Sequence, residues 1–153
     1  MTEMTDLERA VLTKFLDGDH PILKSLRHQL KTCRVETREL TGVGFYTNLV
    51  VEESVSERID GNLIIDDVVA QQIDGLRHGA SFVLYIKNGA LTMLEGSSYD
   101  ESWPKKISSF KLSYRNSKGE GGMSDERDWQ ALAKILDQKK RNNPVEQSAT
   151  DSE

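Results

Sequence analysis

The stretch SFVLYIKNGALTMLE, residues 81–95, limits the possible folds of this chain more than any other feature. Asn88-Gly89 lies between two runs of apolar and β-branched residues, and this dipeptide favours a two-residue type I′ turn because both positions need a positive φ. The stretch therefore predicts a β-hairpin, which we place in the middle of a sheet since both of its faces are fairly apolar. Counting outward from the turn pairs Ile86 with Leu91, Leu84 with Met93, and Phe82 with Glu95. This register places Glu95 on the inward face.

The rest of the chain predicts an α+β fold. Thr5 and Glu8 have the spacing of a capping box for a first helix, and Pro21 suits the first position of a second helix. Apolar residues alternate from position 35 onward, which predicts further strands, and Ser124 is expected to cap a last helix. We expect two N-terminal helices, a mostly antiparallel sheet of about five to six strands, and one C-terminal helix.

The length of 153 residues suits one domain. We assign residues 1–118 to a single α+β domain. Residues 119–141 are expected to form a linker and a C-terminal helix packed on or beside it, because glycines precede an amphipathic pattern. The polar run NNPVEQSATDSE predicts a disordered tail over residues 142–153.

The composition points to a cytoplasmic protein with no membrane contact. The longest apolar runs are far too short to cross a bilayer. The N-terminus, MTEMTDLERA, lacks the basic and apolar regions of a secretory signal. Cys33 is the only cysteine, so no intramolecular disulfide can form, and we expect a reduced, buried thiol.

The net charge of −5 is unevenly distributed. Residues 52–74 are acidic with Arg58 as their only base, whereas residues 105–118 carry five bases and no acid. The alternatives stay open: a solvated surface or complementary strands lying side by side on the one hand, and a docking surface for a partner on the other. The acidic candidates for binding are Glu52, Glu53, Asp66 and Asp67. A partner protein with a basic surface is expected, and nucleic acid is not, because no pervasive basic face is present.

Few residues have the pattern that catalysis or a cofactor requires. The three histidines, His20, His28 and His78, are scattered and form no ligand-spaced pair, so no metal site is predicted. The setting of Cys33 is apolar and does not favour a reactive thiolate. The glycines of residues 119–122 lack the strand, helix and lysine of a phosphate-binding loop. We therefore expect no cofactor.

The stretch LEGSSYDESWP, residues 94–104, is the other candidate site. Glu95 has two alternatives. Its carboxylate either caps the following turn by accepting from the backbone amides and serine hydroxyls of residues 96–98, or takes part in acid–base chemistry. The candidate binding residues of the loop that follows are Tyr99, Asp100, Glu101 and Trp103. For Trp103 there are again two alternatives, since an aromatic in a polar loop either covers the end of the sheet or contacts a partner.

Four motifs occur together in the chain: GDHP at residues 18–21, TGVGFYT at 41–47, GLRHGASF at 75–82, and MLEG with WP between residues 93 and 104. In this order they resemble a family of small, functionally uncharacterised bacterial proteins. The resemblance spans residues 7–115 and implies a bacterial, cytoplasmic, single-domain protein. It supplies no catalytic residues to transfer.

These observations favour a non-enzymatic protein-binding module, such as an immunity or inhibitor protein that masks a basic partner. The acidic segment and the absence of a catalytic pattern carry this hypothesis. The alternative is a small enzyme or ligand-binding domain with a pocket around Glu95, His78 and Tyr46. The sequence does not indicate an oligomeric state.

Overall fold

The computed structural model describes residues 3–52 and 58–137. Two short helices begin at residues that cap them. In α1 (Asp6–Phe15) the Glu8 amide donates to the Thr5 hydroxyl at 3.0 Å and the Thr5 amide donates to Glu8 Oε1 at 2.8 Å. α2 (Pro21–Leu30) has His20 Nδ1 as the acceptor for the Ile22 amide, at 3.1 Å. The predicted capping box and the predicted Pro21 start are confirmed.

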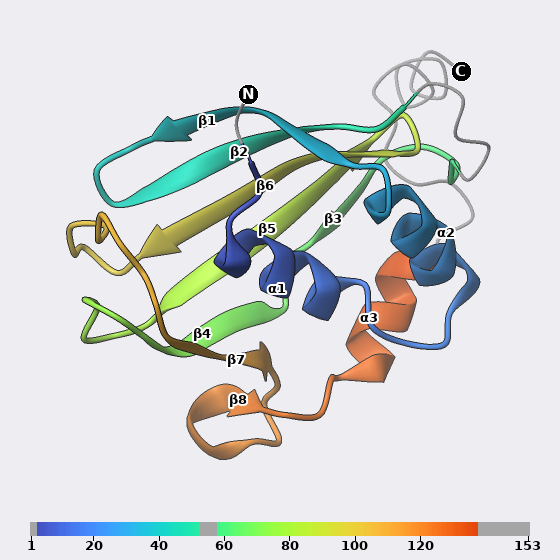
Figure 1. Ribbon diagram of the computed structural model, residues 1–153. Coiled ribbons are helices and arrows are strands. Elements are labelled where there is room, and N and C mark those ends of the chain that lie inside the picture. The colour runs from blue at the N-terminus through green and yellow to red at the C-terminus, as the bar shows by residue number, and fades with distance from the viewer. Residues whose placement is uncertain (1–2, 53–57, 138–153) are drawn as a thin grey trace, which may run out of the picture.

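The strands form one antiparallel sheet with the order β1-β2-β6-β5-β4-β7-β8, and β3 pairs with β5 beside that path (Figure 1). The strands are β1 (Arg34–Leu40), β2 (Gly44–Val50), β3 (Leu63–Ile65), β4 (Val68–Ile73), β5 (Ala80–Lys87), β6 (Ala90–Ser98), β7 (Phe110–Arg115) and β8 (Met123–Ser124). The α+β prediction is confirmed, and the hairpin β5–β6 is central. The expected five to six strands are corrected to eight within the described residues, and the two-residue β8 is too short to show a period.

The hairpin register differs from the prediction beyond the first pair. Asn88 and Gly89 both have positive φ, and Ile86 pairs with Leu91 as expected. Thr92 is an extra residue in β6, so Leu84 pairs with Leu94 instead of Met93. Such a bulge moves every later side chain to the opposite face. Glu95 therefore pairs with Val83 on the outer face, and the inward placement predicted for it was wrong.

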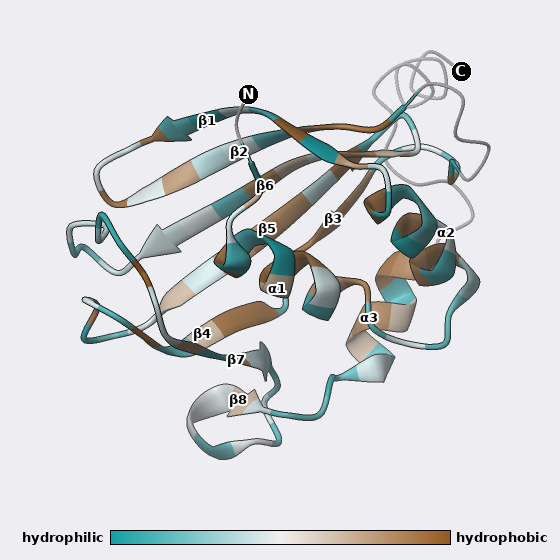
Figure 2. Ribbon diagram, in the orientation of Figure 1, coloured by the Kyte–Doolittle hydropathy of each residue, from teal (hydrophilic) through white to brown (hydrophobic). Residues whose placement is uncertain are grey.

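The three described helices lie on one face of the sheet and leave the other face uncovered (Figure 1). α1 contacts β4, β5 and β7, while α2 contacts β6. In β5 the buried side chains alternate with half-buried ones, as expected for a strand covered on one side only. Figure 2 shows hydrophobic residues concentrated in β3, β4 and β5. Of the residues described, no helix is both long and apolar enough to cross a lipid bilayer.

The last helix starts later than predicted. α3 (Trp129–Leu136) is capped by Asp128, whose side chain accepts from the Ala131 amide at 3.1 Å. Ser124 instead ends β8 and accepts from the Glu126 amide, so its predicted role as the helix cap was wrong. A short 3₁₀ turn, Glu120–Gly122, precedes β8. Leu132 and Leu136 of α3 are buried in the same core as the sheet and the first two helices.

Candidate functional site

A cavity of about 530 Å³ lies at one end of the sheet, between the start of α1 and the covered face of β1 and β2. The loop after β6 lines a further side of the cavity. Four segments line it: Thr5 to Glu8; Arg38, Leu40 and Gly42; Gly44 and Phe45; and Trp103, Pro104, Lys105 and Ile107. A concave site of this size with mostly apolar walls and few polar groups is typical of binding pockets.

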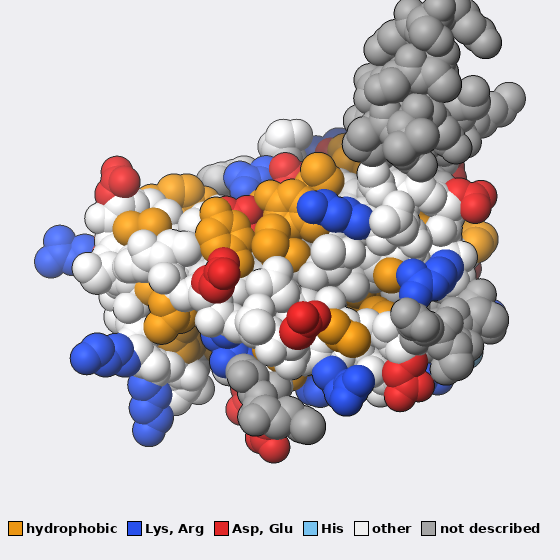
Figure 3. All heavy atoms as spheres, turned by 90° about the horizontal axis from the view of Figure 1, so that it is seen from above, with side chains coloured by type: hydrophobic (Ala, Val, Ile, Leu, Met, Phe, Trp, Pro, Cys, Tyr) orange, Lys and Arg blue, Asp and Glu red, His pale blue; other side chains and the backbone are white. Residues whose placement is uncertain are grey.

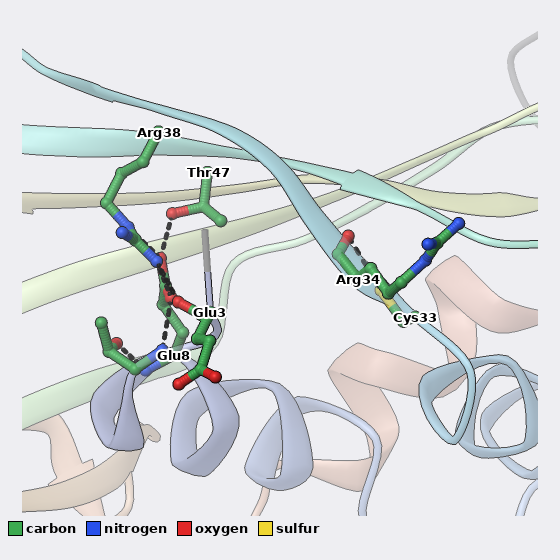
Figure 4. Close-up of polar contacts among 7 residues, drawn as sticks. Glu3, Glu8, Cys33, Arg34, Arg38 and Thr47 are labelled. Atoms are coloured by element: carbon green, nitrogen blue, oxygen red, sulfur yellow. Dashed lines mark hydrogen bonds and ion pairs between the residues drawn. The ribbon is translucent and has the colours of Figure 1, made fainter. Parts of the chain in front are cut away.

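The polar part of this pocket is the contact of Glu8 with Arg38. Figure 4 shows the side chains of Arg38, Thr47 and Glu8 converging from β1, β2 and α1. Arg38 Nε and Nη2 donate to the two oxygens of Glu8 at 2.8 and 2.6 Å, a bidentate pair. The Thr47 hydroxyl also donates to Glu8 Oε2. Arg38 and Thr47 are paired residues of β1 and β2, so the sheet register holds both against α1.

The Glu8 carboxylate is held in its ionised form. Burial opposes ionisation, but the hydrogen bonds from Arg38, Thr47 and the Thr5 backbone outweigh it and keep the pKa of Glu8 below its usual value. Its two oxygens accept four hydrogen bonds from these donors. A carboxylate with a lowered pKa and this many donors is a poor general base. The group therefore supports the pocket and does not suit proton transfer.

Trp103 forms part of the pocket wall. Its ring meets Phe45 edge to face, with centroids 5.3 Å apart and an interplanar angle of 64°. Its backbone amide donates to the Gly42 carbonyl at 2.8 Å. Trp103 therefore covers the end of the sheet, which is the first of the two alternatives stated for it. It stays half-buried, so a molecule in the pocket can contact it.

Two loops near the pocket are joined by Glu101. Its carboxylate accepts from the backbone amides of Arg77 and His78 at 2.9 to 3.1 Å, which lowers its pKa. Ser98 closes the turn, because its hydroxyl donates to the Glu101 carbonyl and accepts from the Glu101 amide. Glu101 therefore orders the loop from Tyr99 to Pro104, while Asp100 is exposed with a φ of 63°.

The end of the sheet that holds the pocket exposes apolar side chains. The described residues contain five large hydrophobic side chains that are exposed, and three of them lie at this end of the sheet. Leu40 is 75% exposed, Tyr99 49% and Val43 45%. The Ser98 amide donates to the Val43 carbonyl, which joins the β1–β2 turn to the loop of Tyr99. An apolar pocket beside exposed apolar side chains is typical of interaction sites.

Glu95, Tyr46 and His78, the residues of the alternative hypothesis, are only partly brought together. Tyr46 of β2 and Glu95 of β6 are direct partners in the sheet. The Tyr85 hydroxyl donates to Glu95 Oε1 at 3.0 Å. His78 lies in the turn between β4 and β5, and within the described residues no hydrogen bond joins it to Glu95 or Tyr46. None of the three lines the pocket.

The acidic and basic segments lie side by side, because β4 pairs with β7. Asp67 forms a bidentate ion pair with Arg127 at 2.7 and 2.9 Å. Asp74 accepts from the amides and hydroxyls of Ser108 and Ser109, which lower its pKa to about 2. Asp66 and Glu52 are exposed, and Glu53 lies outside the described residues. The two segments are neighbours, but their charges do not pair: within the described residues no ion pair joins an acid of residues 52–74 to a base of residues 105–118.

Other chemistry finds little support in the described residues. They contain no group of three or more histidine, cysteine or carboxylate side chains placed to hold a metal ion. Cys33 is buried, and burial raises the pKa of its thiol to about 11, so the reactive thiolate is scarce near neutral pH. No family model, curated protein or solved structure matches the chain.

Sequence reasoning missed most of the pocket. Glu8 was identified as a helix cap, and this is the one signal that pointed to its position. Nothing in the pattern of β1 shows that Arg38 points toward α1, because a charged residue on an edge strand normally faces solvent. Phe45 was predicted as part of a strand, without a role in a site.

Proposed function

We propose that this chain is a non-enzymatic protein-binding module whose pocket accepts a large apolar side chain from a partner. The observation that carries the proposal is the pocket formed by α1, the β1–β2 hairpin and Trp103, together with the exposed Leu40 in its wall. Interfaces obtain most of their binding energy where an aromatic or aliphatic anchor fills such a pocket and the rim excludes water.

The exposure of Leu40 favours a protein segment over a free small molecule as the occupant. A small ligand is usually enclosed on most sides, whereas here Leu40 in the pocket wall is 75% exposed and the exposed Val43 follows it in the β1–β2 turn. A peptide chain that places one side chain in the pocket can also cover these residues. The saturated Glu8 carboxylate supports binding over catalysis. The role of an immunity or inhibitor protein stays a prediction from the sequence.

The proposal is tested by selecting peptides from a phage-displayed random library on the immobilised full-length chain. The selected peptides are expected to share an aromatic or large aliphatic residue. Binding of a selected peptide to the Leu40→Ser variant should weaken by roughly five-fold, the effect of removing one large apolar contact of about 1 kcal/mol. Leu40 is too exposed for this change to endanger folding.

Ile64→Ser is the matched control, because Ile64 is also an exposed aliphatic residue on a strand but lies in β3, outside the pocket. It should leave the affinity unchanged. Equal weakening by both substitutions, or a selection that yields no peptide with an apolar anchor, would reject the proposal.

A further inference from the structure

None of the helices in the described part of the chain covers the outer face of the sheet, and the centre of this face combines aromatic and acidic side chains. Two rows of neighbouring residues cross the strands there: Glu39, Tyr46, Glu95 and Val83 in one, and Thr37, Asn48, Met93 and Tyr85 in the other. Neither row contains a basic residue. Tyrosine and methionine are enriched where proteins meet. Figure 3 shows the molecule of Figure 1 from above, and on this side hydrophobic side chains gather between charged ones.

Glu95 lies between two tyrosines in this face. It is the sheet partner of Tyr46, and its Oε1 accepts from the Tyr85 hydroxyl at 3.0 Å. The pKa of Tyr85 is raised, first by partial burial and then by the hydrogen bond to Glu95 and the nearby charge of Glu95 and Asp66. The tyrosine hydroxyl thus orients the carboxylate and does not neutralise it.

No ion pair within the described residues neutralises Glu95, although the exposed Lys87 lies on the same face, two residues beyond Tyr85 in β5. The ion pairs of the described residues join Arg38 to Glu8, Arg127 to Asp67 and His20 to Asp137, and none involves Glu95. Glu39 lies on the other side of Tyr46 in the same row and adds a second carboxylate. A cation placed over Tyr46 or Tyr85 is attracted by the ring face and by Glu95 at once.

We propose that the outer sheet face binds an arginine side chain of a basic protein partner, with Glu95 as the anion and Tyr46 and Tyr85 as the aromatic surfaces. Arginine fits better than lysine, because its planar guanidinium stacks on a tyrosine ring while donating to a carboxylate. The inference rests on the proposed function only in taking the partner to be a protein. The pocket lies on the covered face of the sheet, so either site can fail without the other.

The test is an NMR titration of the full-length ¹⁵N-labelled chain with a short peptide of arginines separated by glycines. Amide shifts should cluster on β2, β5 and β6 around Tyr46, Tyr85 and Glu95. The Glu95→Gln variant should bind the peptide roughly five-fold more weakly, since it loses a charge-assisted contact. Tyr46→Ala should weaken binding by a similar factor. The same peptide with the neutral isostere citrulline should not bind, and a lysine peptide should bind less tightly.

Glu126→Gln is the matched control, because it removes one exposed negative charge at a position between β8 and α3. It should leave the affinity unchanged. Shifts spread over all exposed carboxylates, or equal weakening by Glu95→Gln and Glu126→Gln, would show attraction by net charge alone and overturn the inference. Leu40→Ser should bind the arginine peptide normally, which separates this site from the pocket.

Discussion

Glu8 is the residue on which three features of this molecule depend. It completes the capping box of α1, pairs with Arg38 of β1, and forms the polar part of the pocket. Its side chain is only 2% exposed. A buried carboxylate is stable only when its charge and its oxygens are satisfied, and here an arginine, a threonine and a backbone amide supply that.

Glu8→Gln should therefore destabilise the fold by about 2 kcal/mol, because the amide cannot pair with the Arg38 charge or accept all four hydrogen bonds. The free energy of unfolding in urea measures the change. Glu36→Gln is the control, since Glu36 is an exposed acid of the same strand that Arg38 occupies, and it should shift the value by less than about 0.5 kcal/mol. A loss as small as that of the control would mean that the Glu8–Arg38 pair adds nothing to stability.

The lowered pKa of Glu8 also predicts a pH dependence. A group whose pKa is lower in the folded chain than its usual 4.5 stabilises the fold at pH values above 4.5, and this contribution is lost as the pH falls through the folded value. The difference in unfolding free energy between wild type and Glu8→Gln should stay constant from about pH 7 to about pH 5 and shrink toward about pH 3. Asp74 and Glu101 also have lowered pKa values, but both proteins contain them, so they cancel. A difference that does not vary with pH would contradict the prediction.

At the scale of elements, local signals in the sequence predicted where helices and turns begin. Thr5, Pro21 and Asn88-Gly89 each act within a few residues, so their effect does not depend on distant contacts. The bulge at Thr92 could not be predicted in the same way. An extra residue in a strand leaves the apolar composition unchanged, and the Thr92 hydroxyl, which accepts from the Lys87 amide and donates to the Ala90 carbonyl, is recognisable only once the pairing is known.

The contact of α2 with the central hairpin depends on one buried polar side chain. Gln29 is fully buried, donates to the Gly89 carbonyl at 2.8 Å and accepts from the Leu91 amide at 2.9 Å. Gln29→Leu should cost about 2 to 3 kcal/mol, because both backbone groups lose a partner away from water. Gln130→Leu on the exposed side of α3 should change stability by less than about 0.5 kcal/mol. Urea unfolding of both variants checks this, and equal effects would argue against the role of Gln29.

At the scale of the whole molecule, the pocket was beyond sequence reasoning because its walls come from residues 5–8, 38–45 and 103–107. Their proximity follows from the strand order, in which β1 and β2 join the sheet beside β6 and not beside β3. The proximity of the acidic segment, residues 52–74, to the basic segment, residues 105–118, was equally beyond the sequence. Their opposite signs were visible, but only the pairing of β4 with β7 shows that they are neighbours.

The C-terminal helix is part of the core, so residues 1–118 should not fold as an independent unit. α3 buries Leu132 and Leu136 to 2% and 1% exposure, and the preceding Arg127 pairs with Asp67 and donates to the Asp17 carbonyl. Removing two buried leucines alone forfeits about 3 to 6 kcal/mol, a large part of the 5 to 15 kcal/mol that stabilises a typical domain. A chain that ends at Lys118 should lose cooperative urea unfolding and near-ultraviolet dichroism, whereas a chain that ends at Arg141 retains α3 and should keep both. Cooperative unfolding of the shorter chain would show that the sheet and the first two helices form a complete core without α3.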